Sequence, residues 1–437
     1  MSELPSGWGR AEIGDLCNLI NGRAFKPQEW SDSGLPIIRI QNLNNPASKF
    51  NHFSGDFDAK HHVKNGDLLF AWSGTPGTSF GAHIWHGGDA VLNQHIFKIE
   101  FSERETNRGF LRYAINQKLD ELISSAQGGV GLRHVTKGTF EKTEISFPPL
   151  AEQTRITQKL DELLAQVDTL KARIDAIPVL LKRFRRSVLA AAVSGRLTEE
   201  WRAQNSSAEW QTITVGELCK LKSGIAVSGD IEKAKGDFKY FKVGEMNLEG
   251  NEFFLQKTDR YLARDDAPEK SLMPAGAIVF PKRGGAIATN KKRILKDASF
   301  VDLNVMGIIA PEGVETLYIY RWFETVDLAK LNTGSTIPQV NNTDIAPLII
   351  PLPPLAEQTE IVRRVEQLFA FADQLEAKVA SAKSRIDHLT QSILAKAFRG
   401  ELVPQDPNDE PASVLLERIQ AQRAAAPKAK RGRKASA

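Results

Sequence analysis

Basic and hydroxyl-bearing residues gather in two loop segments that occupy matching places in the two halves of the chain. Segment 280–293 carries five basic residues around a Gly-Gly pair, whereas segment 70–80 has an aromatic residue and hydroxyls in place of the charges. Arginine and lysine contact phosphates and the edge of guanine, and serine, threonine and asparagine can contact both backbone and bases. On local composition alone such loops are more often solvated turns, so nucleic-acid contact is a hypothesis that the architecture must support.

A second pair of segments, 128–135 and 333–340, comes just before the last expected strand of each half and aligns with the repeat described below. These four loops are the candidates for DNA contact if the architecture supports it. The candidate residues of the second half are Lys282, Arg283, Lys291 and Arg293. Those of the first half are Trp72, Ser73, Thr75, Arg133 and His134.

Other residues that could do chemistry form no recognisable catalytic or metal site. Paired histidines such as His61-His62 have no counterpart in the second half, so we expect them at the surface or facing DNA and predict no metal. Cys17 and Cys219 are expected to be small buried apolar residues. Phosphate-binding, dinucleotide-binding, zinc-protease, serine-hydrolase and amino-methyltransferase motifs are absent, so neither catalytic residues nor a bound cofactor is expected.

The chain contains one module twice. The heptapeptide Pro-Pro-Leu-Ala-Glu-Gln-Thr at 148–154 returns unchanged at 353–359. Upstream, Trp8 and the segment Gly14-Asp-Leu-Cys are matched by Trp210 and Gly216-Glu-Leu-Cys. The interiors of the two copies drift by insertions and deletions, which loops tolerate. We therefore expect two similar scaffolds that carry different loops.

A long helical segment without glycine follows each heptapeptide. Apolar residues from Ile156 to Val188 recur at alternating steps of four and three, and the second copy repeats these positions from Ile361 to Ile393. This heptad pattern predicts a long helix that packs along a partner helix. The two helices can pair antiparallel, or each can pack only on its own domain.

Proline and glycine mark the expected interruption and ends of these helices. Pro178 should kink the first helix or split it in two. Gly195 and Gly400 should stand at the helix C-termini, where glycine is favoured.

The globular halves read as a mixed α/β (α+β) fold. Strands are expected at 36–40, 67–70, 95–99, 144–147, 277–280, 305–309 and 348–350, and helices at 106–125 and 315–331. The domains are placed at 1–147 and 201–352, the conserved helical spacers at 148–200 and 353–404, and a partly disordered tail at 405–437.

Bulk composition agrees with two or three domains of an ordinary globular protein. The 437 residues are 41% hydrophobic and 25% charged, with a net charge of only +4, which allows a polyanionic partner without demanding one. No apolar run is long enough to span a membrane, and the first residues do not resemble a secretion signal. A cytoplasmic location is expected.

In combination, three features resemble the specificity (S) subunits of type I restriction–modification systems. They are the repeated strand-Pro-Pro-Leu-Ala-Glu-Gln-helix junction, the Trp…Gly-Asp/Glu-Leu-Cys opening of each half, and the helix ends at Gly195-Arg-Leu and Gly400-Glu-Leu. The resemblance covers nearly the whole chain. It implies two target-recognition domains, each reading one half of a bipartite site on double-stranded DNA, separated by two long antiparallel helices in a pseudo-twofold repeat.

The same resemblance implies the partners. Two modification (methyltransferase) subunits would dock on the helices, and restriction (translocase–nuclease) subunits would join the complex. S-adenosylmethionine and ATP would belong to those partners. Three alternatives stay open: a related methyltransferase-only or fused system, an enzyme with an unrecognised site, and a coiled-coil scaffold that touches no nucleic acid. The DNA target, its spacer and the methylated bases cannot be read from the sequence.

Overall fold

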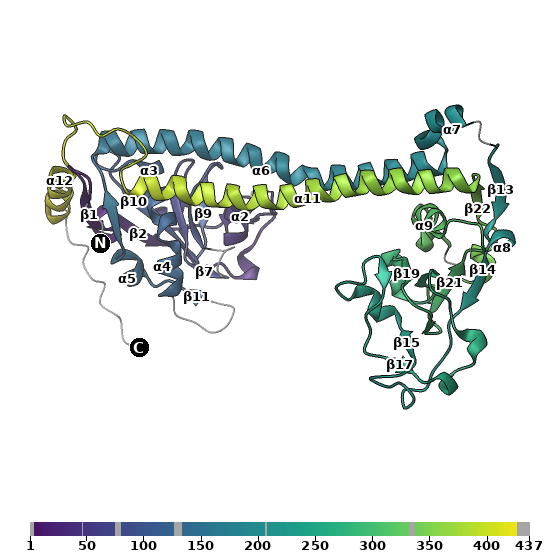
Figure 1. Cartoon of the computed structure of the whole chain (residues 1–437). Coiled ribbons are helices and arrows are strands. Elements are labelled where there is room, and N and C mark those ends of the chain that lie inside the picture. Colours follow the sequence, from purple (N-terminus) through teal and green to yellow (C-terminus); the bar gives the residue numbers. More distant parts are fainter. Residues whose placement is uncertain are drawn as a thin grey trace. The chain divides into compact units, whose positions relative to one another are not determined.

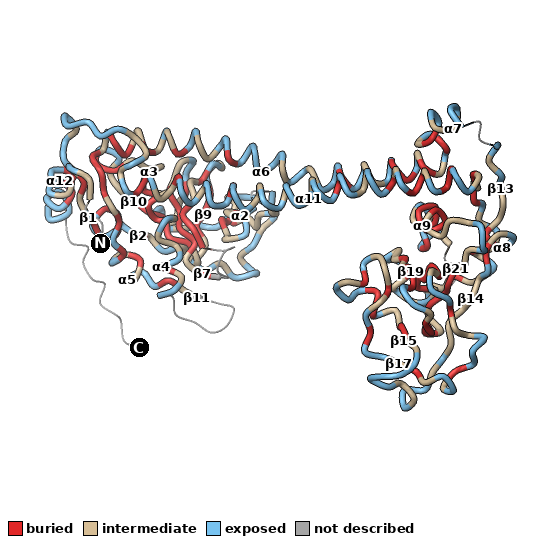
Figure 2. The backbone as a smooth tube through the Cα atoms, viewed as in Figure 1, coloured by how far each residue is buried: buried red, intermediate tan, exposed pale blue. Residues whose placement is uncertain are grey.

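The chain divides into two compact units. The computed structural model describes residues 4–45, 47–74, 80–125, 133–205, 208–331 and 337–425. Residues 1–173 and 383–437 form the first unit, and residues 174–382 form the second. Each unit has its own buried interior, which lies among its sheets and against the long helices (Figure 2).

Two four-stranded sheets form the scaffold of the first unit (Figure 1). The antiparallel sheet has the order β2-β10-β6-β8 and consists of Cys17–Asn21, Ile96–Phe101, Leu68–Ala71 and Gly81–Ile84. The mixed sheet has the order β4-β3-β9-β5 and consists of Asn51–Phe53, Leu35–Ile38, Ala90–Leu92 and His62–Val63. Strand β6 is buried throughout, as its unbroken run of apolar residues indicates. Two short pairs complete the unit: β1–β12 (Gly9–Glu12, Glu144–Phe147) and β7–β11 (Ser73–Gly74, Arg133–His134).

The second unit repeats this scaffold. Its larger sheet has the order β14-β21-β18-β19-β16 and consists of Lys220–Ser223, Val305–Ile309, Ile278–Pro281, Arg293–Leu295 and Phe254–Leu255. The smaller sheet has the order β17-β15-β20 and consists of Tyr261–Leu262, Phe238–Phe241 and Ser299–Val301. The strand pair β13–β22 (Gln211–Thr214, Ile349–Leu352) matches β1–β12. All seven strands expected from the sequence are present, with ends shifted by a few residues at most.

The shorter helices also correspond between the units. The first unit has α1 to α5, at Ile13–Leu16, Ile40–Asn44, Arg108–Gln117, Leu119–Ser124 and Lys137–Glu141. The second has α7 to α10, at Glu199–Asn205, Val215–Leu218, Thr316–Glu324 and Asn342–Ile345, and 3₁₀ turns that include η4 (Val243–Asn247). The expected helix at 106–125 is thus two helices that meet at Lys118. The one expected at 315–331 is α9 followed by a 3₁₀ turn at Leu328–Leu331.

Two helices of 44 residues follow the heptapeptides: α6 (Leu150–Val193) and α11 (Leu355–Phe398). They run antiparallel, because Lys171 pairs with Asp387 in the first unit and Arg185 pairs with Asp373 in the second. Of the two outcomes expected at Pro178, a kink or a split, the split does not occur, since α6 continues through the proline. Packing against α11 on both sides of the proline outweighs the one lost backbone bond. Both helices end at glycines with φ of 76° and 73°, as predicted.

Each long helix also packs on its own domain. Ile361 and Val365 of α11 are fully buried in the same cluster as Trp322 of α9. In the first unit, Asp161 of α6 accepts hydrogen bonds from Arg112 and Tyr113 of α3. The two arrangements considered from the sequence therefore occur together.

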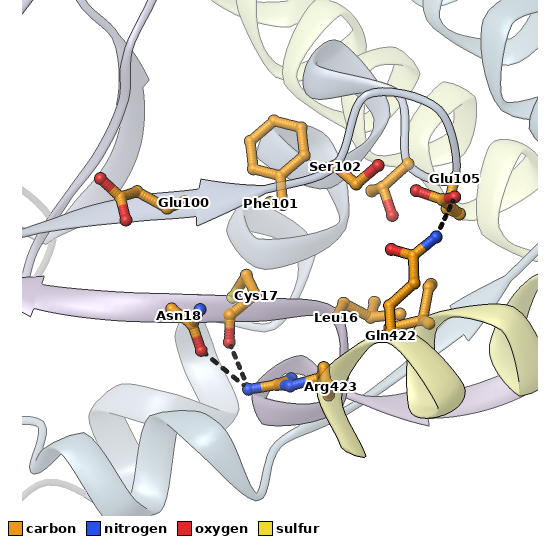
Figure 3. A pocket seen from close by; sticks show the side chains of 11 residues that line it. Leu16, Cys17, Asn18, Glu100, Phe101, Ser102, Glu105, Gln422 and Arg423 are labelled. Atoms are coloured by element: carbon orange, nitrogen blue, oxygen red, sulfur yellow. Dashed lines mark hydrogen bonds between the residues drawn. The ribbon is translucent and has the colours of Figure 1, made fainter. Parts of the chain in front are cut away.

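Within the expected tail, 405–437, a further helix packs on the first unit. This helix, α12 (Ala412–Ala425), begins where the Ala412 N–H donates to the Gly7 carbonyl at 2.9 Å. Arg423 donates to the Cys17 carbonyl and to Asn18 Oδ1, and Gln422 donates to Glu105, beside a small cavity of about 340 Å³ (Figure 3). Residues 426–437 lie outside the described part of the chain.

Candidate nucleic-acid interface

The first unit has an aromatic and polar cluster where strand β6 ends. The Trp72 N–H donates to the His95 carbonyl, and the Trp72 carbonyl accepts from Val135 N. These bonds bring three loops together. Ser73 Oγ lies 2.8 Å from Nδ1 of His134, and the Trp72 ring stacks on Phe97 with centroids 5.5 Å apart. The imidazole of His95 lies 5.5 Å from the same indole.

This cluster offers hydrogen-bonding atoms that the protein itself does not use. Trp72 Nε1 and His95 Nδ1 are shielded from solvent and have no hydrogen-bond partner among the described residues. Burial, together with the nearby His134 and Arg39, lowers the pKa of His95, so its ring is neutral at pH 7. Buried polar atoms without partners are uncommon in proteins, and a ligand is one way to satisfy them.

A shallow cavity of about 270 Å³ adjoins His95 and widens this polar surface. Its walls include Trp30, Arg39, Gln41 and Gln94. The Arg39 guanidinium lies 5.7 Å from the centre of the Trp30 ring, and Gln94 is exposed. An arginine and two glutamines can form bidentate bonds to guanine and adenine edges, respectively.

The second unit has a homologous cluster with other side chains. Lys282 N donates to the Asn304 carbonyl, and the Lys282 carbonyl accepts from Val340 N, which repeats the bonds of Trp72. Arg283 forms a bridge with Gln339, as Ser73 does with His134. Positions 282, 283, 304 and 339 are therefore the structural counterparts of 72, 73, 95 and 134.

The second cluster is basic where the first is aromatic. Lys282 Nζ donates to Ser223 Oγ at 3.0 Å, and burial together with the nearby Arg283 lowers the pKa of the lysine. Gln339 Nε2 donates to Asn341 Oδ1 at 2.7 Å. Lysine, arginine, asparagine and glutamine are the side chains that most often read guanine and adenine in the major groove.

Five of the nine candidates from the sequence stand at these homologous positions: Trp72, Ser73 and His134 in the first unit, and Lys282 and Arg283 in the second. Thr75 lies outside the described residues, and for Arg133 only the backbone, paired with Gly74, is described.

Lys291 and Arg293 lie at a different place in the second unit. Lys291 donates to Asn247, and the Arg293 guanidinium donates to the carbonyls of Lys292 and Met246. Sequence reasoning missed His95, Asn304, Gln339 and Arg39. The equivalence of His95 and Asn304 is visible only in the structure, where their carbonyls accept from the residues that follow strands β6 and β18. In the sequence, loops of unequal length hide this alignment.

Nothing in the described part of the chain suggests catalysis by thiol or metal. Burial raises the pKa of Cys17 to about 12 and that of Cys219 to about 11, so neither is a reactive thiolate at neutral pH. No group of three or more potential metal ligands is present among the described residues. Within the same residues, no helix is both long and apolar enough to cross a membrane.

Comparison with known proteins assigns the family. The family model described as the type I restriction modification DNA specificity domain matches residues 5–179 and 207–382, so each match covers one domain and part of the helix after it. The chain belongs to this family. The specificity subunit of the type I restriction enzyme EcoBI from Escherichia coli is 33% identical over 99% of this chain and 95% of its own length. That of StySPI from Salmonella potsdam is 33% identical over 99% of both chains.

Solved structures show the same fold. The HsdS subunit from Thermoanaerobacter tengcongensis aligns with a TM-score of 0.60 at 18% identity, covering 92% of this chain and 99% of that one. A chain of a type I restriction–modification system aligns with a TM-score of 0.66, also at 18% identity. The chain is a type I specificity subunit by family, with two similar domains and two long antiparallel helices.

Proposed function

We propose that each domain reads one half of a bipartite site on double-stranded DNA through the cluster at the end of its β6 or β18 strand. One observation carries this proposal: four homologous positions on the same backbone hold Trp, Ser, His and His in one unit and Lys, Arg, Asn and Gln in the other. A conserved scaffold with exchanged polar side chains is what two different half-sites require.

The side chains suggest how reading is divided. In the second domain Arg283 and Lys282 would contact guanine edges or phosphates, and Asn304 and Gln339 would contact adenine edges. In the first domain His134, His95 and Arg39 would supply the polar contacts, with Trp72 as an apolar surface against thymine methyl groups or sugars.

The long helices would hold the partner proteins. Large apolar side chains remain exposed on them: Leu170 and Leu389 in the first unit, and Val179, Leu180 and Phe371 in the second. Exposed apolar groups on a helix pair favour protein docking. The occupants would be two modification (methyltransferase) subunits, which restriction subunits then join. S-adenosylmethionine and ATP would bind to those partners, and this subunit would be non-catalytic and work on DNA in the cytoplasm.

The decisive experiment is a map of methylated sites produced by the complex reconstituted with its modification subunits. Arg283→Ala should relax one position in one half-site and leave the other half-site unchanged. Lys270→Ala removes the same charge from an exposed residue of the same unit and should leave the map unchanged. An unchanged map after exchange of the two domains would refute DNA reading, and cleavage or S-adenosylmethionine binding by the isolated chain would refute the non-catalytic role.

A further inference from the structure

The first unit contains a cavity of about 790 Å³ whose lining includes none of the residues proposed above to contact DNA. It lies between strand β8, helices α2 and α3, and the first half of α6. Its walls include the aromatic residues Phe50, Trp85 and Tyr113, with His83 of β8 and Asp168 of α6. This volume is ample for a side chain from another molecule.

The lining of the cavity carries one arginine, Arg112, and one carboxylate, Asp168, and the carboxylate of Asp161 lies next to Arg112. Arg112 pairs with Asp161 at 3.4 Å, and Tyr113 donates to the same carboxylate at 2.5 Å, while Arg112 Nε is buried without a hydrogen-bond partner among the described residues. Burial and the positive charge of Arg112 lower the pKa of His83, which is neutral at pH 7. Asp168 is exposed, and no described residue forms a hydrogen bond or ion pair with its side chain. The unpaired carboxylate of Asp168 is therefore the feature of the lining that favours a cation as the occupant.

The second unit shows what fills the homologous space. The strand registers place Arg293 of β19 at the position of His83, because Val279 pairs with Arg293 as Leu69 pairs with His83. The Arg293 guanidinium donates to the Met246 carbonyl at 3.1 Å. Met246 is the counterpart of Leu43, which lines the cavity of the first unit. The second unit thus has a guanidinium at the position where the first unit has the imidazole of His83.

The long helices also have an arginine in the second unit at a position where the first unit has none. Asp168 and Asp373 stand at the same position after their heptapeptides. Asp373 binds Arg185 at 2.5 Å, whereas the matching position of α11 in the first unit is Thr390, whose hydroxyl donates to the Ile386 carbonyl. The aspartate is thus present in both units, and an arginine partner at the matching position is present only in the second.

We propose that the first-unit cavity binds the guanidinium of an arginine side chain from a partner protein that packs beside α6. Asp168 supplies a charge-assisted hydrogen bond, and the rings of Trp85 and Phe50 supply cation–π contact, since the Arg112 guanidinium already lies 4.2 Å from the centre of the Tyr113 ring. His83 Nε2, which is buried without a partner among the described residues, can accept a further N–H. The site concerns a protein contact and is independent of which residues read DNA.

The test uses the full-length chain and N-acetyl-L-arginine methylamide as the probe, with binding followed by ligand-observed NMR. The citrulline analogue has the same shape without the charge, and inorganic phosphate tests whether the cavity takes an anion through Arg112. Arginine probe binding should exceed that of the citrulline analogue by about tenfold, the value of one charge-assisted hydrogen bond.

Variants that copy the second unit into the first localise the site. His83→Arg and Thr390→Arg should each fill or neutralise the cavity and weaken probe binding by about tenfold or more, as should Asp168→Asn. Asp120→Asn, an exposed carboxylate of the same unit, should bind as the parent does. Circular dichroism confirms the fold of each variant.

Equal binding of the arginine and citrulline probes would overturn the proposal. So would preferential phosphate binding, or unchanged arginine binding in folded His83→Arg and Thr390→Arg. Loss of DNA reading in Arg283→Ala with arginine binding intact would leave this inference standing. A parent chain that reads DNA but does not bind the arginine probe would refute this inference and leave the proposed function standing.

Discussion

Trp8 donates its indole N–H to the buried carboxylate of Glu152 at 2.9 Å, which ties the first residues of the domain to the heptapeptide that ends it. In the second copy Trp210 donates to Glu357 at 3.0 Å. The neighbouring glutamine acts as a second tie: the Gln153 carbonyl oxygen accepts from Asn107 N at the start of α3, and its amide donates to the Pro148 carbonyl. The repeated heptapeptide thus joins the end of each domain to its beginning, and we call this contact the closure of the domain.

The two closures differ in the number of hydrogen bonds that their glutamate accepts. Glu357 also accepts hydrogen bonds from Thr198 and Arg202, whereas Glu152 Oε1 is buried without a partner among the described residues. A carboxylate removed from a buried, fully bonded network leaves several donors unsatisfied. The second closure should therefore be the more sensitive to substitution.

We predict that Glu357→Gln destabilises the second unit by about 3 kcal/mol, because an amide in place of the fully buried carboxylate cannot accept from Arg202, Thr198 and Trp210 together. Glu152→Gln should change the stability of the first unit by less than about 1 kcal/mol, since its carboxylate has one N–H bond from Trp8 and an unused oxygen. Hydrogen exchange resolved by unit measures both values. Equal losses in the two variants would contradict this account.

The closures should respond to pH in opposite directions. Burial raises the pKa of Glu152 above its ordinary 4.5 despite the Trp8 bond, so its favourable contribution is full below pH 4.5 and declines as pH rises through the raised pKa. Burial also acts to raise the pKa of Glu357, but the bonds from Arg202, Thr198 and Trp210 outweigh it and hold that pKa below 4.5. Its contribution is present above pH 4.5 and is lost as pH falls through the lowered pKa.

The indole N–H resonances of Trp8 and Trp210 report these titrations directly. The Trp8 signal should shift with a midpoint above pH 4.5, and the Trp210 signal with a midpoint below it. Glu152→Gln and Glu357→Gln should each abolish one of the two shifts. A common midpoint would mean that the closures do not differ electrostatically.

Gly22 and Gly224 are needed where the scaffold approaches itself most closely. A Cβ on Gly22 would lie 1.9 Å from the Asn93 carbonyl oxygen, and one on Gly224 would lie 2.1 Å from that of Asp302. Backbone atoms cannot yield to such contacts, so alanine at either position should cost about 3 kcal/mol or more. Thermal unfolding tests this, with Gly138→Ala as control because nothing lies within 4 Å of its Cβ.

Much of the scaffold was predictable because its signals are local. Apolar runs located the strands, the heptad spacing gave the long helices, and glycine at 195 and 400 marked their ends. The helix at Ala412–Ala425 was missed because it has little amphipathic pattern and holds its place through Arg423 and Gln422, which bond to residues some 300 to 400 positions away.

The clusters at the ends of strands β6 and β18 were only half predictable. Lys282 and Arg283 stand out by charge, but Asn304 and His95 join them through backbone bonds between loops, which no spacing in the sequence reveals. Arg293 stays a prediction of DNA contact that rests on its charge, while in the fold its guanidinium donates to the carbonyls of Lys292 and Met246.

Arg293→Met should therefore act on stability more than on DNA reading. The substitution leaves the carbonyls of Met246 and Lys292 without the guanidinium N–H groups, in a position where burial already lowers the pKa of Arg293. A loss of about 1–3 kcal/mol is expected from the unsatisfied acceptors. Arg283→Ala, by contrast, should leave unfolding unchanged and weaken binding to the preferred half-site by about 1–3 kcal/mol. Denaturant unfolding and DNA titration on the same two variants separate the roles, and a base-specific binding defect in a fully stable Arg293→Met would reverse the assignment.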